Sequence, residues 1–237
     1  MQPPGSVAVL AIVDFAPGAR WAGIRNLMFG RWPLSRVPGV RFRKVLGSGH
    51  EGGFGLKPSV SHQGLFAVFD DDAAADAWLE SSEQLALYRA RGNSWLTMKL
   101  RAYASRGAWD SVEPVALSVP APSGGVIASL TRGSIKPSRA TEFWEHAPKA
   151  QEAIARSEAC LLSIGLGEAP VFRQCTFTLW RSEAELVGWA RDSAHHAAAQ
   201  AALQGGHFSE SLFTRLVPYA ARGNWKGLDA ASLGVRA

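Results

Sequence analysis

The sequence predicts an α+β protein built from two halves of the same design, and three observations support this fold class. A motif of the form Tyr-Ala-x-Arg-Gly-x-Trp occurs at residues 103–109 and again at 219–225. Before each copy come a glycine-rich segment and then a strand-like segment, at 46–51 and 64–69 in the first half and at 164–168 and 175–180 in the second. Each strand-like segment leads into an acidic, alanine-rich stretch that contains Trp78 or Trp189. A repeat of this length indicates a duplicated domain rather than a short solenoid unit.

The first half reads as four strands and two helices. Residues 7–13 are apolar and β-branched, which predicts a buried first strand. Apolar residues at helical spacing predict a helix at 21–29, which the prolines at 33 and 38 bring to an end. A second strand is expected at 40–46, before a loop at 47–55 that is crowded with glycine. The remaining elements are a strand at 64–69, a helix at 72–89 and a strand at 94–103.

The second half repeats this order after a linker rich in proline and glycine at 118–125. Its strands are expected at 126–131, 160–165, 175–180 and 212–219, and its helices at 138–157 and 183–203. Each half is thus β-α-β-β-α-β, which is the ferredoxin-like pattern. We expect a first half at 1–117, a second at 126–237, and two sheets packed face to face as a pseudo-dimeric α+β barrel. Such a barrel offers space for a ligand between a sheet and its helices.

The composition is apolar for a protein of 237 residues. Charged residues make up 19% of the chain, against about 25% in typical soluble proteins. This favours an apolar ligand or peripheral contact with a membrane, although a soluble protein with a large core would also explain it. The net charge of +5 is spread along the chain without a nucleic-acid-binding motif, so nucleic acid is not expected as a partner. No secretory signal or membrane-spanning run is visible, which predicts a cytoplasmic location. Homo-oligomerisation is left open.

Two adjacent histidines, His195 and His196, fall in the predicted helix at 183–203 and flank its apolar stripe. A single imidazole on a helix that faces an apolar cavity is a common way to hold haem iron. Neighbouring residues point about 100° apart on a helix, so the two cannot both bind one ion. Trp189 lies on the same flank as His196. Because the matching stretch of the first half has no histidine, a prosthetic group would belong to the second half. The alternative is a pair of surface histidines.

Three other features need an interpretation. The Gly-x-Gly-Glu at 165–168 lacks the third glycine and the helix of a dinucleotide fingerprint, so we expect a tight crossing between neighbouring strands instead. Arg132 and Lys136 lie between a strand and a helix start, where they could bind an anionic group such as a haem propionate. Structural pairing with Glu142 or Glu168 is the alternative for these two cations. Cys160 and Cys175 are too few for a disulfide framework or a zinc site and are expected to be buried thiols.

Several ordered motifs resemble the spheroidene monooxygenase family of acyclic carotenoid ketolases. They include Leu-Gly-Ser-Gly at 46–49, Leu-Thr-Arg-Gly-Ser-Ile at 130–135 and Ser-Ile-Gly-Leu-Gly-Glu-Ala-Pro at 163–170. Thr-Phe-Thr-Leu-Trp at 176–180 and Phe-Ser-Glu-Ser-Leu-Phe-Thr-Arg at 208–215 complete the resemblance, which extends over residues 7–227. His207 and Leu216 depart from the family pattern, in which aromatic residues are usual at both positions.

The resemblance implies a haem-dependent monooxygenase that introduces a keto group into an acyclic carotenoid. Its cofactor would be haem b, with O₂ and electrons from an external donor protein such as a ferredoxin. In related haem proteins of the dimeric α+β barrel superfamily a histidine on the last helix of one half binds the iron. This matches His195 or His196, with His196 favoured. Two alternatives remain: a haem enzyme of other chemistry in the same fold, such as a dehydratase, and a non-catalytic binding module without haem.

Overall fold

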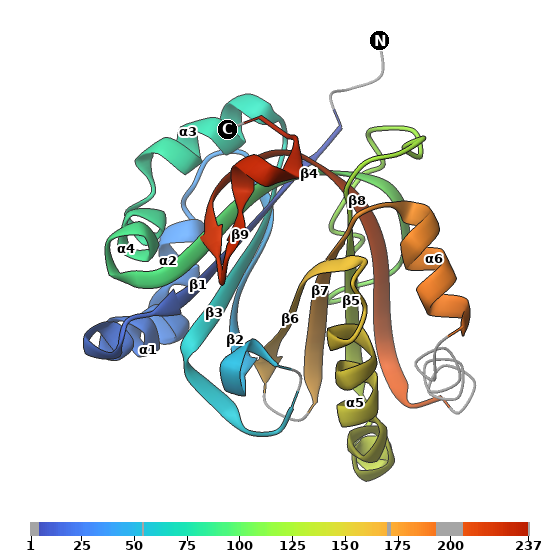
Figure 1. Cartoon of the computed structure of the whole chain (residues 1–237). Helices are drawn as coiled ribbons and strands as arrows, with labels where there is room; N and C mark the ends of the chain where they lie inside the picture. The colour runs from blue at the N-terminus through green and yellow to red at the C-terminus, as the bar shows by residue number, and fades with distance from the viewer. Residues whose placement is uncertain (1–4, 54, 170–171, 193–205, 237) are drawn as a thin grey trace.

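Eight antiparallel strands form a closed barrel with helices packed outside it, in a computed structural model of the chain (Figure 1). The structure describes residues 5–53, 55–169, 172–192 and 206–236. The strand order is β4-β1-β3-β2-β6-β7-β5-β8, and β8 pairs back onto β4. Each half thus contributes four adjacent strands in the ferredoxin-like order, and the predicted pseudo-dimeric α+β barrel is confirmed.

The first half contains the predicted elements with three corrections. A short additional helix, α2, runs through Pro33, and the glycines at 47 and 49 belong to a strand rather than to the expected loop. The predicted helix at 72–89 is two helices, because Ser82 leaves the helical conformation with ψ 114°. The Oγ of Ser82 accepts the N–H of Leu85 at 3.3 Å and so caps the second helix. The elements are β1 (Val7–Phe15), α1 (Arg20–Phe29), α2 (Arg31–Leu34), β2 (Val40–Gly49), β3 (Pro58–Phe69), α3 (Asp72–Ser81), α4 (Glu83–Arg91) and β4 (Gly92–Gly107).

The second half repeats the arrangement with longer strands than the sequence indicates. The elements are β5 (Ile127–Ile135), α5 (Ala140–Ala155), β6 (Cys160–Ala169), β7 (Arg173–Trp180), α6 (Glu183–Asp192), β8 (Phe208–Trp225) and β9 (Leu228–Asp229). Residues 118–125, between β4 and β5, form neither helix nor strand. No described helix has the length and apolarity needed to cross a bilayer.

The two halves join along two seams of unequal length. β4 and β8 pair over twelve positions, whereas β2 and β6 pair only through Gly47 with Gly167 and Ser48 with Leu166. The Gly-x-Gly at 165–167 therefore lies inside β6 and reaches the seam between halves, which corrects the expected crossing between neighbouring strands. The strand pairing also changes the alignment of the two halves at this point by two residues. Gly47 pairs with Gln63 as Gly167 pairs with Gln174, so Gly47 is equivalent to Gly167 and not to Gly165.

The interior of the barrel is a packed apolar core. Alternate residues of the strands point inward, among them Leu10, Phe66, Leu100, Leu130, Phe177 and Leu216. Trp109 is fully buried and stacks on Phe66 with ring centroids 5.9 Å apart, and Trp225 packs at right angles to His62. Because side chains fill the barrel, a ligand has to be sought on its outer faces, between strands and helices.

Candidate functional site

The outer faces of the two sheets differ sharply, although the strands beneath them are copies. In the first half Val9, Ala11 and Val13 of β1 are fully buried under the helices. They pack there with Phe69, Trp78 and Tyr88 in one continuous apolar layer. The first half therefore has the filled sheet–helix layer that is usual in an α+β fold.

At the matching positions of β5 stand Ser129, Thr131 and Gly133. The strand pairing establishes this correspondence, because Val7 pairs with Phe69 of β3 as Ile127 pairs with Trp180 of β7. Thr131 is exposed although β5 is a central strand, with β7 on one side and β8 on the other. An exposed side chain in the middle of a sheet face means that the described helices do not cover it.

Small and polar residues continue across this face onto the neighbouring strands. On β7 and β6 the outward residues are Thr176, Thr178, Ser163 and Gly165, and Ser163 is also exposed. The corresponding residues of the first half are Leu65, Ala67, Arg43 and Val45. We use the name open face for the outward residues of the second half, namely Ser129, Thr131, Ser163, Gly165, Thr176 and Thr178.

Aromatic side chains close one end of the open face. Trp180 is fully buried and lies against Trp189 of α6, with ring centroids 5.1 Å apart. The indole N–H of Trp189 donates to the carbonyl oxygen of Ala153 in α5 at 3.3 Å, so that this one residue connects both helices with the sheet. Ile127 and Leu186 complete this apolar cluster, which is much smaller than its counterpart in the first half.

A polar group borders the same cluster. Arg215 of β8 forms an ion pair with Glu183 at the start of α6, at 2.6 Å. Burial, aided by the nearby Glu183 carboxylate, raises the pKa of the Tyr103 hydroxyl to about 12. Tyr103 therefore stays protonated at neutral pH and can donate a hydrogen bond beside the open face.

Of the residues that the sequence singles out, Trp189 lies beside the open face and Arg132 does not. His195 and His196 lie outside the described residues. Arg132 is 2% exposed and belongs to the barrel-facing set of β5, opposite to the open face. Its guanidinium forms an ion pair with Glu210, and not with Glu142 or Glu168, the two partners that the sequence suggests.

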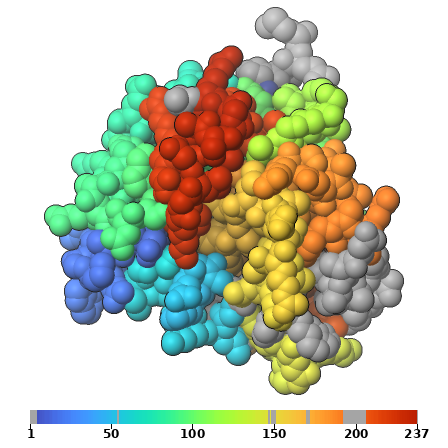
Figure 2. Space-filling view, viewed as in Figure 1, coloured from blue at the N-terminus to red at the C-terminus, as the bar shows by residue number. Residues whose placement is uncertain are grey.

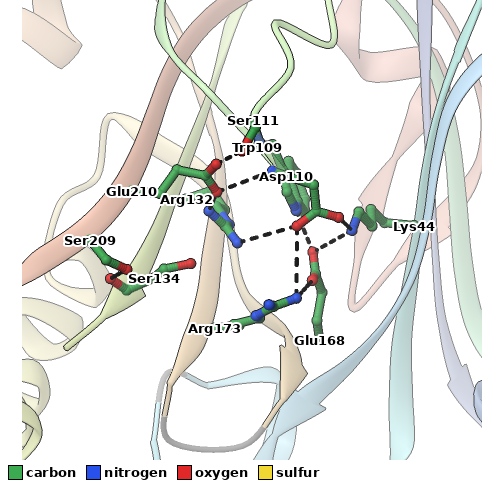
Figure 3. Close-up of polar contacts among 10 residues, drawn as sticks. All are labelled: Lys44, Trp109, Asp110, Ser111, Arg132, Ser134, Glu168, Arg173, Ser209 and Glu210. Carbon is green, nitrogen blue, oxygen red and sulfur yellow. Dashed lines mark hydrogen bonds and ion pairs between the residues drawn. The ribbon is translucent and has the colours of Figure 1, made fainter. Parts of the chain in front are cut away.

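Arg132 belongs to a charged cluster that closes one mouth of the barrel (Figure 3). Lys44 contacts Glu168 at 3.0 Å, and Arg173 contacts the same carboxylate at 3.3 Å. Asp110 pairs with Lys44 and lies 3.9 Å from Arg132. The cluster draws its members from five strands and one loop, so a local sequence motif does not predict it. Its members are Lys44, Asp110, Arg132, Glu168, Arg173 and Glu210.

Glu210 holds the loop after Trp109 in place. Its carboxylate accepts the backbone N–H groups of Ser111 at 2.7 Å and Asp110 at 3.1 Å, where both residues have positive φ. Burial alone would raise the pKa of Glu210, but these two bonds and the Arg132 charge hold it below its ordinary value. The three cations and three carboxylates balance one another, which indicates a structural closure rather than an anion site.

A polar groove of about 640 Å³ is lined by residues of the first half and by Lys226 of the second half. Asp14, His50, Glu51, His62 and Lys226 are among its lining residues. Burial lowers the pKa of His62, so that its ring is neutral at pH 7. Among the described residues, no cluster of three or more His, Cys, Asp or Glu side chains could hold a metal ion.

The predicted burial of the two thiols is confirmed for Cys175 and only in part for Cys160. Cys175 is buried in the barrel core and Cys160 is partly buried. Burial raises the pKa of Cys160 to about 11 and moves the pKa of Cys175 in the same direction. Neither thiol is a nucleophile at neutral pH.

The open face is the structural difference between the halves that the sequence analysis did not predict. The signal for it was present in the repeat: Val-Ala-Val-Leu-Ala-Ile-Val at 7–13 corresponds to Ile-Ala-Ser-Leu-Thr-Arg-Gly at 127–133. Val9, Ala11 and Val13 on the outward side are replaced by Ser129, Thr131 and Gly133, whereas Val7 is replaced by another apolar residue, Ile127. A comparison of the two strands by alternation would have located the face.

Solved structures support the fold. The chain resembles the crystal structure of an aldoxime dehydratase, with TM-score 0.60 and 13% identity over 92% of this chain and 83% of that one. It also resembles an aldoxime dehydratase in complex with butyraldoxime, with TM-score 0.63 and 9% identity over 100% of this chain and 88% of that one. At such identities the likeness concerns the fold alone.

Sequence relatives are much closer than these structures. No family model matches the chain. It is 45% identical to a spheroidene monooxygenase of Rubrivivax gelatinosus over 223 residues, which cover 94% of this chain and 86% of the relative. It is 34% identical to a spheroidene monooxygenase of Rhodobacter capsulatus over 87% of both chains. Identity of this extent over nearly the whole length shows that the chain belongs to the spheroidene monooxygenase family.

Proposed function

We propose that this protein is a haem-dependent monooxygenase that uses O₂ to introduce a keto group into an acyclic carotenoid. The observation that carries the proposal is 45% identity over 94% of the chain to a relative named spheroidene monooxygenase. Family membership supports a monooxygenase. The haem, the use of O₂ and the keto product are the finer parts of the proposal, and they need their own experiments.

The open face fits a broad, flat group such as haem. Its residues are small, with Gly165 and Ser163 on β6 and Ser129 and Thr131 on β5, so that a planar ring can approach the strands closely. The first half has no such surface, because Val9 and Ala11 are fully buried at the matching positions. This asymmetry supports one haem per chain, in the second half.

His196 is the proposed axial ligand, with His195 as the alternative. Both follow α6 in the chain, and α6 is fixed against the sheet by the contact of Trp189 with Trp180. When bound, haem b would supply the activation of O₂. The chain would orient the cofactor and the substrate, and Trp180, Trp189 and Ile127 would exclude water from one end of the face.

A long, uncharged polyene suits the composition of the chain. Charged residues make up 19% of the chain, against about 25% in typical soluble proteins. Tyr103, protonated at neutral pH because burial raises its pKa to about 12, can donate a hydrogen bond near the cluster of Trp180. Electrons would come from an external donor protein such as a ferredoxin.

An absorption spectrum of the purified protein tests the haem. We expect a Soret band after haem supplementation, and its absence would refute the oxygenase proposal in favour of a binding module. His196→Ala should abolish the band while His195→Ala retains it, and retention in both variants would contradict the ligand assignment. Thr131→Phe should reduce haem uptake by filling the open face, and Thr131→Ala, which leaves the space, is the matched control.

The product distinguishes the proposed chemistry from that of other haem enzymes. Expression in a host that makes acyclic carotenoids should yield products heavier by one keto oxygen in place of two hydrogens, and labelled O₂ should supply that oxygen. The alternative is a dehydratase, since aldoxime dehydratases share this fold. A purified protein that binds haem, leaves carotenoids unchanged and dehydrates aldoximes would support that alternative.

A further inference from the structure

The outward surface of α1 and α2 is apolar to an unusual degree. Trp21 is 81% exposed, and Met28 and Trp32 are each 63% exposed. These three residues and Arg25 lie three or four positions apart, which places them on one helix face. Phe29, which is 49% exposed, lies beside them, and the centroid of its ring is 6.2 Å from that of Trp32. We call Trp21, Arg25, Met28, Phe29 and Trp32 the α1–α2 surface.

The buried side of α1 is small and polar, the reverse of an ordinary surface helix. Gly23 packs so tightly that a Cβ atom would lie 2.7 Å from the ring of Phe15. Asn26 donates to Gln63 at 3.0 Å and to the Tyr88 hydroxyl at 3.1 Å. Close packing and buried hydrogen bonds therefore attach α1 to the sheet, while Trp21, Met28 and Phe29 remain exposed.

The second half shows that this inversion is not required by the fold. Trp21 and Arg25 follow the end of β1 by as many residues as Thr141 and Glu145 follow the end of β5. Thr141 and Glu145 are polar and exposed on α5, whereas the apolar Ile154 of the same helix is buried. The same helix thus exists in an ordinary form in the same chain.

All charged residues of the segment 16–39, which includes α1 and α2, are arginines. Arg20, Arg25, Arg31 and Arg36 are all exposed, and residues 16–39 contain no aspartate or glutamate. Within the described part of the chain, none of these four arginines forms an ion pair. The segment lies at the margin of the molecule, on the side away from α6 (Figure 2).

We propose that the α1–α2 surface docks the protein onto a membrane surface that contains anionic lipids. Exposed tryptophan on a basic helix is typical of segments that lie in the headgroup region of a bilayer. Trp21, Met28 and Trp32 would insert there, and the four arginines would contact lipid phosphates. A second copy of this chain fits less well, because a symmetric contact would bring two clusters of arginine together.

Vesicle flotation with the full-length protein tests this proposal. The probes are vesicles of phosphatidylcholine alone and vesicles with roughly one-third phosphatidylglycerol. We expect binding to the anionic vesicles that weakens when salt is raised from about 0.1 M to about 0.5 M. The double variant Trp21→Ser/Trp32→Ser should lower the partition coefficient at least tenfold, by about 1.4 kcal/mol or more, and Arg25→Gln about fivefold.

Matched controls use exposed residues elsewhere. Leu117→Ser removes a side chain that is 58% exposed, and Arg156→Gln removes an exposed arginine from the end of α5. Both should bind vesicles like the parent protein. All altered side chains point outward, so urea midpoints should not change. Met28→Glu provides a second variant of the surface that acts by charge repulsion.

Three results would overturn the proposal. These are equal recovery with both vesicle types, binding that the tryptophan and arginine variants leave unchanged, and a parent dimer that Trp21→Ser/Trp32→Ser converts to a monomer without any vesicle binding. Binding of an acidic electron-donor protein through this surface, without vesicle binding, would likewise assign it to a protein partner. Since no readout involves haem or a carotenoid, failure here would leave the proposed function untouched, and the reverse also holds.

Discussion

The α-carbon of Gly107 approaches the carbonyl oxygen of Ser211 so closely that a Cβ atom at residue 107 would lie 2.0 Å from it. The same contact exists in the second copy, where a Cβ at Gly223 would lie 2.4 Å from the carbonyl oxygen of Trp95. Both glycines have positive φ, 97° and 104°. The repeated Arg-Gly-x-Trp therefore marks the two places where one half crosses over the other.

Substitution of Gly107 by alanine should destabilise the barrel. The new methyl group would meet backbone, which cannot move aside, and the positive φ adds strain for any residue with a side chain. We expect a loss of about 2 kcal/mol or more in the free energy of unfolding, measured by urea denaturation. Gly223→Ala should behave alike. Gly124→Ala, in open space, is the control and should change stability by less than about 0.5 kcal/mol.

Ala11 and Thr131 allow a matched test of the open face. Ala11→Thr would bury a hydroxyl in a filled apolar layer, and we expect it to cost about 1–3 kcal/mol. Thr131→Ala removes a hydroxyl from an exposed position and should change stability by less than about 0.5 kcal/mol. Equal effects of the two substitutions on the urea midpoint would show that the second sheet face is filled like the first.

Glu210 should contribute stability that depends on pH. Its folded pKa lies below the ordinary 4.5, so the stabilisation is present above that value and is lost as pH falls through the folded pKa. Glu210→Gln leaves Arg132 buried without its carboxylate and should cost about 3 kcal/mol at pH 7. The difference from the parent protein should shrink below about pH 4.5. Glu152→Gln breaks an exposed pair instead and should cost less than about 0.5 kcal/mol at any pH.

The three tyrosines should resist ionisation in the folded protein. Burial is the main cause of a raised pKa in each tyrosine. It raises the pKa of Tyr103 to about 12, and the pKa values of Tyr88 and Tyr219 move in the same direction. The absorbance of tyrosinate should therefore stay low through pH 11 and rise only at higher pH or on unfolding. Since the folded pKa values lie above the unfolded ones, their stabilisation is complete below about pH 10 and is lost above it. Ordinary titration near pH 10 in the folded state would contradict this.

Sequence reasoning recovered the fold because the repeat is long and ordered. Copies of one motif at 103–109 and 219–225 imply copies of the sheet between them, and two such sheets have few ways to bury their apolar faces. Local patterns placed the strands, but not their ends. The strand β6 continues through Gly165 and Gly167, because glycine within a strand looks like a loop when its partner strand is unknown.

Long-range pairing explains what the sequence could not reveal. Arg132 looks like a free cation near a helix start, and only the register of β5 with β8 brings Glu210 within reach of it. Helical spacing predicts α1 but does not tell which face is buried, and here Gly23 and Asn26 turn inward while Trp21 turns out. The roles of His195 and His196 stay predictions.

The pairing of β4 with β8 has a consequence for biosynthesis. β8 ends at Trp225 and follows the other seven barrel strands in the chain, so the barrel cannot close until β8 has left the ribosome. Until then the first half presents the inner face of Leu10, Phe66 and Leu100 to solvent. Exposed apolar surface of this kind favours aggregation and recruits chaperones during synthesis. Yield of soluble protein should therefore depend on translation rate and on chaperone supply more than on the stability of the finished barrel.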